Sequence, residues 1–156
     1  MAKVLVVFYA GDPSLATFAG EFVEGAKSVR FTEVRSVAVP ADGPRGRESW
    51  IEELRDYDGV AFGVAGGDAA GLTRAVEAVY PRRALENLVG AVFSSNGGAE
   101  PMLQLARLGM LLVPEPSGPE GASERAQLHG RRTAQVAGWV RHALSHEHAQ
   151  HHEHDH

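Results

Sequence analysis

The chain has 156 residues, the size of one ordinary domain, and 44% of them are hydrophobic, which is enough for a sizeable core. It contains no cysteine, which excludes disulfides, thiolate nucleophiles and cysteine-ligated zinc or iron–sulfur centres. Lys and Arg number 15 against 20 Asp and Glu, and the formal charge of −5 argues against a nucleic-acid or anionic-membrane partner.

Short apolar runs predict the strands of a parallel sheet. Lys3–Tyr9, Gly59–Gly63 and Val89–Ser94 are continuous, rich in β-branched or aromatic residues and bounded by turn residues, as strands buried on both faces are. Phe31–Val37 and Met110–Val113 are weaker strand candidates.

Segments with apolar residues at spacings of three and four predict helices between the strands. They are Pro13–Val29, Arg47–Tyr57, Ala70–Leu85, Glu100–Leu108 and Ser123–Leu144. Such alternation predicts right-handed strand–helix–strand units and a doubly wound α/β domain. Five strands in one domain fit a flavodoxin-like, three-layer α/β/α fold with a parallel sheet in the order 2-1-3-4-5. We expect this domain to cover residues 1–144, followed by a flexible, polar, histidine-rich tail at 145–156.

The first apolar run, Val4–Ala10, is too short to span a bilayer, which takes about 20 residues. It leads into Gly11-Asp12-Pro13, which does not resemble a signal-peptide cleavage region. The sequence therefore predicts a cytoplasmic protein with no membrane partner.

Several segments are similar to a known family. They are MAKVLVVFYA at 1–10, LRDYDGVAFG at 54–63, LVGAVFSSNGG at 88–98, LGMLLVP at 108–114 and, more loosely, residues 124–144. In these segments the chain resembles the WrbA-type NAD(P)H:quinone oxidoreductases, which are FMN proteins of flavodoxin fold. The resemblance implies FMN as cofactor, NAD(P)H and a quinone-like acceptor as partners, and a homo-oligomer, with a dimer favoured.

The loops at the carboxyl ends of the strands are where such a fold binds its ligand. The resemblance places the cofactor-binding residues there, at Ala10, Gly11, Asp12, Ser14, Leu15, Ala65, Gly66, Gly67, Ser95, Asn96, Gly97 and Gly98. Glycine permits close backbone approach to a ligand, but strand–helix turns need glycine as well, so glycine content does not distinguish the two roles. No catalytic side chain stands out, since a flavin would carry the chemistry itself.

The first loop departs from the family pattern. Ala10 stands where the family has a serine, and Asp12-Pro13 reads as a helix N-cap followed by proline at the first helical position. A carboxylate there would occupy the positive helix end that should receive the FMN phosphate. The second loop lacks the arginine and aromatic residue that frame the flavin ring in the family. Two hypotheses remain. One is an FMN-dependent oxidoreductase. The other is a cofactor-free flavodoxin-fold protein, either a pseudo-enzyme or an interaction domain, with a metal-chelating histidine-rich tail.

The histidines are gathered at one end of the chain. Of the 8, only His129 and His142 precede residue 146, and we expect His129 at the surface or at a helix cap. The remaining ones are candidate ligands for Zn²⁺, Ni²⁺ or Cu²⁺: His146, His148, His151, His152, His154 and His156. A native chelating tail and an added purification tag are both compatible with this composition.

Overall fold

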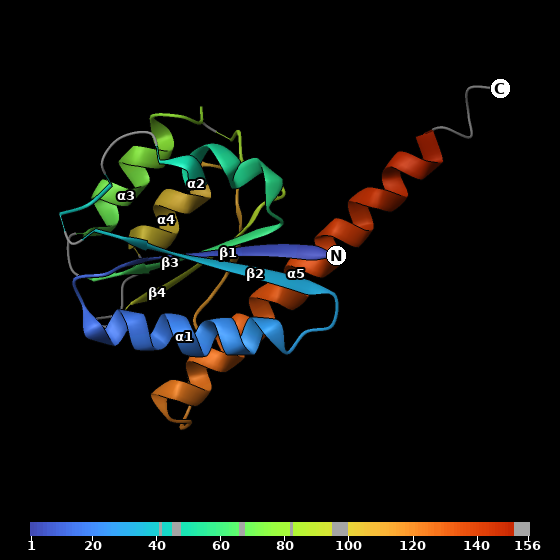
Figure 1. Ribbon diagram of the computed structural model, residues 1–156. Helices are drawn as coiled ribbons and strands as arrows, with labels where there is room; N and C mark the ends of the chain where they lie inside the picture. Colours follow the sequence, from blue (N-terminus) through green and yellow to red (C-terminus); the bar gives the residue numbers. More distant parts are fainter. Residues whose placement is uncertain (41, 45–47, 66–67, 82, 95–99, 152–156) are drawn as a thin grey trace.

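The computed structural model describes residues 1–40, 42–44, 48–65, 68–81, 83–94 and 100–151. Strands and helices alternate along them (Figure 1). The strands are β1 (Ala2–Tyr9), β2 (Thr32–Val39), β3 (Gly59–Val64), β4 (Val89–Ser94) and β5 (Leu111–Val113). The helices are α1 (Pro13–Lys27), α2 (Ser49–Glu52), the 3₁₀ helix η1 (Glu53–Asp56), α3 (Asp68–Glu77), α4 (Glu100–Arg107) and α5 (Ala122–His151).

The strands of the described residues form one parallel sheet in the order β2-β1-β3-β4-β5, which confirms the predicted fold class. In its register, Val4 of β1 pairs with Val34 of β2 and with Gly59 of β3. Because the strands run in one direction, their carboxyl ends meet at one edge of the sheet, here called the carboxyl edge. The opposite edge, where the strands begin, is called the amino edge.

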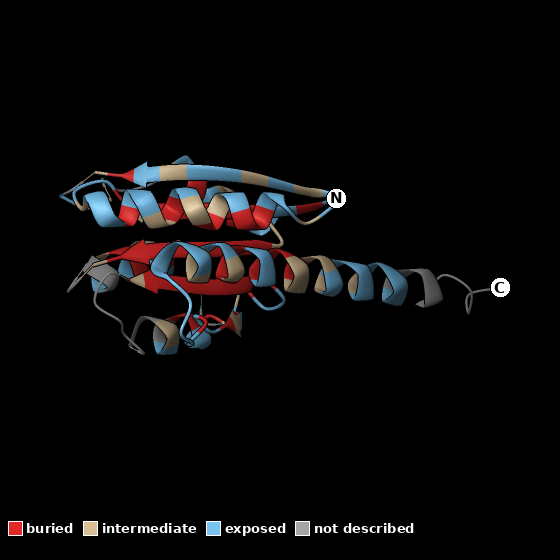
Figure 2. Cartoon of the chain, turned by 90° about the horizontal axis from the view of Figure 1, so that it is seen from below, coloured by how far each residue is buried: buried red, intermediate tan, exposed pale blue. Residues whose placement is uncertain are grey.

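Burial follows from the three-layer arrangement. Helices α1 and α5 cover one face of the sheet, and α2, α3 and α4 lie on the other (Figure 1). The central strands β3 and β4 are buried almost throughout, whereas the edge strand β2 alternates between covered and exposed residues (Figure 2). This is why the central strands read as continuous apolar runs and β2 as a weaker pattern.

Helices α1 and α5 cross at two glycines. A Cβ on Gly25 would overlap the backbone carbonyl of Gln127, and a Cβ on Gly130 would overlap the carbonyl of Phe22. The close approach of the two helices therefore depends on the missing side chains. By contrast, a Cβ on Gly138 would meet nothing within 4 Å.

Two predicted helices have different limits in the structure. The helix expected to reach Leu85 ends at Glu77, because Pro81 lacks an N–H donor and disfavours helical backbone at Tyr80 before it. The Tyr80 hydroxyl instead donates a hydrogen bond to the carbonyl of Ile51, at 2.6 Å, and ties this turn to α2. The segment predicted as one helix at 47–57 contains α2 followed by the tighter η1.

Helix α5 does not end at Leu144, where we expected the domain to end. It continues to His151, because the added residues include the good helix formers Glu147 and Ala149 and contain no glycine or proline. Its last turns project beyond the sheet (Figure 1). Residues 145–151, which we expected to belong to the tail, are helical in the structure, while residues 152–156 lie outside the described part of the chain. No helix in the described ranges has both the length and the apolar character needed to cross a bilayer.

Candidate functional site

The carboxyl edge begins with the turn between β1 and α1. The Ala10 N–H donates to the carbonyl of Val39 at 2.8 Å, which extends the pairing of β1 with β2 past the last strand residue. Ala10 and Gly11 are exposed, and the chain then enters α1 at Asp12. This short turn is where the resemblance places the phosphate of FMN.

Asp12 caps α1 with its own side chain. Its backbone is extended, with φ −111° and ψ 112°, and its carboxylate Oδ1 accepts the N–H of Ser14 at 2.8 Å. The Asp12 carbonyl accepts the next N–H, that of Leu15, at 3.1 Å. Pro13, between them, has no N–H to offer. The N-cap expected from the Asp12-Pro13 sequence is thus confirmed.

This helix end does not fit a phosphate group. Phosphate binds a helix N-terminus through free N–H donors and the positive end of the helix dipole. Here the N–H of Ser14 is bonded to a carboxylate, that of Leu15 to a carbonyl, and Pro13 supplies none. Thr17 points its hydroxyl back at the carbonyl of Pro13, 3.2 Å away. A phosphate would have to displace Asp12 and would meet its negative charge.

The other sequence-derived candidates lie as follows. Leu15 is fully buried in the core beneath α1, and its side chain is therefore turned away from any ligand at the turn. Ser14 is exposed at the start of α1, and Ala65 is half-buried just after β3. Gly66 and Gly67, together with Ser95 to Gly98, lie outside the described residues.

Packing accounts for three conspicuous residues near the carboxyl edge. A Cβ on Gly63 would come within 2.5 Å of the Phe93 ring, so this glycine is required by the core. Tyr9 ends β1 only 4% exposed, with its hydroxyl beside Gly71 of α3. Trp50 of α2 is buried and donates its Nε1–H to Glu48 at 2.7 Å. In the described residues of this edge we therefore find no exposed aromatic platform.

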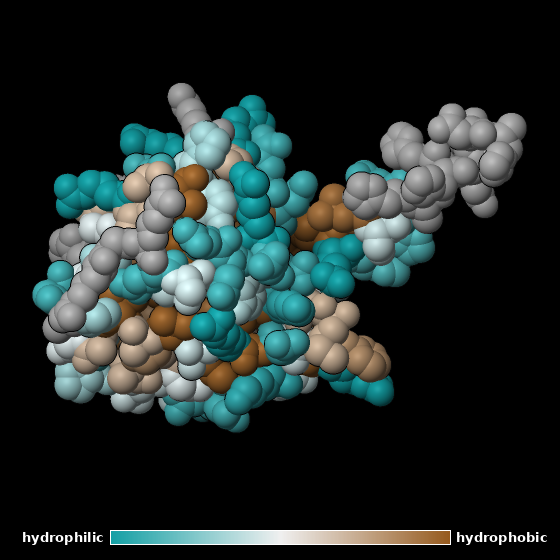
Figure 3. All heavy atoms as spheres, turned by 45° about the horizontal axis from the view of Figure 1, so that its top comes forward, coloured by the Kyte–Doolittle hydropathy of each residue, from teal (hydrophilic) through white to brown (hydrophobic). Residues whose placement is uncertain are grey.

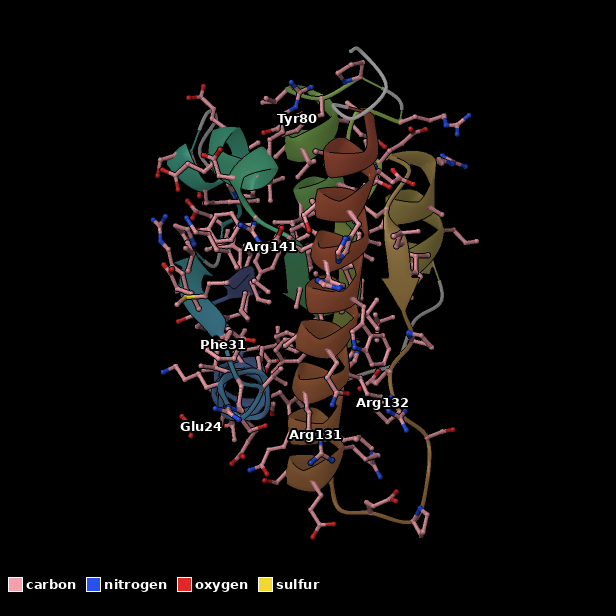
Figure 4. The ribbon with its side chains drawn as sticks, turned by 90° about the vertical axis from the view of Figure 1, so that its right-hand side faces the viewer. Glu24, Phe31, Tyr80, Arg131, Arg132 and Arg141 are labelled. Carbon is pink, nitrogen blue, oxygen red and sulfur yellow. The ribbon has the colours of Figure 1, made fainter. Side chains whose placement is uncertain are left out.

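A groove of about 670 Å³ opens at the amino edge, on the opposite side from these loops. Trp139 of α5, Phe31 before β2 and Met1 line it with large exposed apolar side chains. Figure 4 looks onto this edge, with Phe31 beside α5 and Arg141 above it. Apolar surface also flanks the point where the last turns of α5 leave the body (Figure 3). The groove therefore lies between α5 and the segments that lead into β1, β2 and β3, away from the carboxyl-edge loops.

His129 is buried, contrary to the expectation of a surface residue. Only 1% of it is exposed, its Nε2 lies 3.2 Å from the carbonyl of Val113, and its ring meets Phe22 edge-on. Burial lowers the pKa of His129; the hydrogen bond with Val113 opposes this shift and the charge of Arg132 adds to it. The side chain of His129 therefore belongs to the core between α5, α1 and β5.

Comparison with known protein families finds no match for this chain. Similar solved structures do exist. A flavone reductase superposes with a TM-score of 0.69 at 15% identity, over 90% of this chain and 65% of that protein. A flavodoxin from the domain Archaea gives 0.61 at 16% identity, covering 87% of this chain and 99% of that one. A diflavin flavoprotein A3 from Nostoc sp. gives 0.59 at 17% identity, covering 93% and 97%.

These identities are low, and the chain spans about two thirds of the length of the flavone reductase. The similarity therefore concerns the arrangement of strands and helices, which agrees with the observed strand order. On these grounds the chain has a flavodoxin-like α/β fold.

Proposed function

We propose that this chain is a flavodoxin-fold protein that works without FMN and carries a metal-binding, histidine-rich C-terminal segment. The observation that carries the first half is the hydrogen bond from the Ser14 N–H to the Asp12 carboxylate, at 2.8 Å. It closes the helix end that would otherwise bind the phosphate, and it places a negative charge there.

The second half rests on the sequence and on the course of α5. The helix continues through His151 and its last turns leave the body of the protein (Figure 1), and Ser145, His146 and Glu147 on it are exposed. Neutral imidazole is a good ligand for Zn²⁺, Ni²⁺ and Cu²⁺. His146, His148 and the histidines that follow them would act as the chelating groups.

Two measurements test this proposal on the full-length protein. The purified chain should be colourless and should bind Ni²⁺ or Zn²⁺ in a calorimetric titration. Replacement of the histidines from 146 onward by glutamine should weaken that binding by at least about tenfold. Mutation of a residue that is only hydrogen-bonded to a metal ligand already lowers metal affinity by about 10–100-fold, and loss of the ligands themselves should cost more. A yellow protein with stoichiometric FMN would overturn the first half, and unchanged metal affinity the second.

A WrbA-type FMN reductase is the second candidate. The SSNGG segment after β4 favours it, because this loop keeps the family pattern best, and the fold is shared with a flavodoxin and a diflavin flavoprotein. FMN would supply hydride and electron transfer from NAD(P)H to a quinone-like acceptor. Because the β1–α1 turn does not fit its phosphate, we assign no catalytic step to residues of this chain.

The two candidates differ in their expected partners. An FMN reductase would need NAD(P)H and an acceptor, and the resemblance implies a homo-oligomer, with a dimer favoured. The FMN-free protein needs neither cosubstrate. Oxidation of NADH or NADPH by the purified chain with added FMN and a soluble quinone therefore separates them: we expect no rate above that of FMN alone.

A further inference from the structure

Two histidines of α5 face each other on one side of the helix. The Nε2 atoms of His142 and His146 lie 3.1 Å apart, and the two ring centroids are separated by 4.4 Å. Both residues are exposed, and residues four apart on a helix are surface neighbours. His142 precedes the histidine-rich segment and also lines the groove at the amino edge.

The spacing matches that of two nitrogens on one metal ion. With a metal–nitrogen bond of about 2.0–2.1 Å, two ligands are about 2.9 Å apart at a right angle and about 3.4 Å apart at the tetrahedral angle. The observed 3.1 Å between the Nε2 atoms falls between these values. Little rearrangement of the two rings would bring both nitrogens onto a cation.

We propose that His142 and His146 form a bidentate binding site for a late first-row divalent cation, with Cu²⁺ bound more tightly than Ni²⁺ or Zn²⁺. The order of preference follows from the general affinity order of imidazole sites for these metals. This site deepens the proposed metal-binding function and rests on it. It differs from a site formed by the tail alone because it includes His142, which precedes the tail on the same helix α5.

The pair supplies two ligands. Among the described residues no group of three or more metal-binding side chains is present, so water would complete the coordination of a cation held by this pair alone. Two neighbouring side chains bind groups other than the imidazoles. Nη1 of Arg141 lies 3.3 Å from Oδ2 of Asp58, and the Ser145 hydroxyl donates a hydrogen bond to the carbonyl of His142.

Trp139 provides a reporter for this site. It lies three residues before His142 and seven before His146, which places the three side chains on one stripe of the helix. Trp139 is 68% exposed, whereas the other tryptophan, Trp50, is buried in the core. Cu²⁺ bound by the pair should therefore quench the fluorescence of Trp139, and Trp139→Phe should remove this signal without changing the affinity.

The experiment compares full-length variants that share one background, in which the histidines at 148, 151, 152, 154 and 156 are replaced by glutamine. This background keeps the pair and the buried His129. A Cu²⁺ titration, followed by calorimetry and by tryptophan fluorescence at about pH 8, where imidazole is unprotonated, should show one equivalent bound. Adding His142→Gln or His146→Gln should lower the affinity at least about tenfold.

A register variant is the matched control. His146→Gln combined with Glu147→His keeps the number of histidines but moves one from four to five residues after His142, off the shared face. Its Cu²⁺ affinity should fall to that of His146→Gln alone. An unchanged affinity in this variant, or in His142→Gln, would overturn the bidentate site.

The remaining outcomes separate this site from the proposed function. If the full chain binds metal and the background variant does not, the tail alone is the chelator and the pair is refuted. If neither binds, the proposed metal-binding function fails together with the site. Circular dichroism of each variant checks that α5 is still formed.

Discussion

Asp12 offers the sharpest perturbation, because its carboxylate caps α1 and excludes phosphate at the same time. Asp12→Asn keeps an oxygen that can accept the Ser14 N–H but removes the charge. Asp12→Ala removes the charge and the acceptor together. The two variants should therefore separate helix capping from electrostatic exclusion.

The magnitudes follow from the cap geometry. Loss of an N-cap side chain costs about 1 kcal/mol, and Asn caps about as well as Asp, so Asp12→Ala should be less stable than Asp12→Asn by about that amount. A phosphate accepting the same Ser14 N–H would lie within about 5 Å of the carboxylate, where two negative charges on the phosphate are repelled by about 1.7 kcal/mol even at the dielectric constant of water. This corresponds to more than a tenfold loss of FMN affinity. In Asp12→Ala the Ser14 N–H is also free to donate a hydrogen bond to the charged phosphate, which should favour FMN binding by about 1.5–3 kcal/mol.

The free energy of unfolding and the FMN affinity should therefore rank the three proteins differently. Urea denaturation should give wild type and Asp12→Asn similar free energies of unfolding, and Asp12→Ala a lower one. Flavin fluorescence titration should give FMN affinities that rise from wild type to Asp12→Asn to Asp12→Ala. If removing the charge leaves the FMN affinity unchanged or lowers it, Asp12 does not exclude phosphate, and the proposal of an FMN-free protein is contradicted.

Further predictions concern the crossing of α1 with α5 and the buried histidine. Gly130→Ala would drive a Cβ into the Phe22 carbonyl and should cost at least about 2 kcal/mol, whereas Gly138→Ala in the same helix meets open space and should gain up to about 1 kcal/mol; equal effects in urea denaturation would contradict the packing. Burial lowers the pKa of His129 from its ordinary 6.5, so below that pH the unfolded chain takes up the proton more readily than the folded one. The contribution of His129 to the free energy of unfolding should then be constant above about pH 6.5. Below about pH 6.5 the free energy of unfolding should fall by at most about 1.4 kcal/mol per pH unit, and His129→Gln should flatten that fall. An identical pH profile in the variant would show that His129 titrates normally.

The strands could be predicted well because their signal is local. Val89–Ser94 is a continuous apolar run of the length of one buried strand, and the structure gives it the same limits. The cap at Asp12 was equally predictable, since it involves residues two apart and a proline whose effect does not depend on tertiary contacts.

Long-range contacts decided the features that the sequence did not reveal. The burial of His129 comes from α5 lying against β5 and α1, and a histidine beside a glycine carries no sign of that packing. The role of Gly130 likewise depends on Phe22, more than a hundred residues earlier. The pairing of His142 with His146 was visible as a four-residue spacing, but we expected the helix to stop at Leu144, between them.

The central claim is that the N-terminus of α1 is closed to phosphate, and the comparison of FMN with riboflavin tests it most directly. The two flavins share the ring and differ in the phosphate, so their affinity ratio isolates the contribution of the β1–α1 turn. Parallel fluorescence titrations of the wild-type protein should give FMN an affinity no higher than that of riboflavin. An FMN affinity at least about tenfold above that of riboflavin would correspond to about 1.4 kcal/mol of phosphate recognition and would contradict the claim.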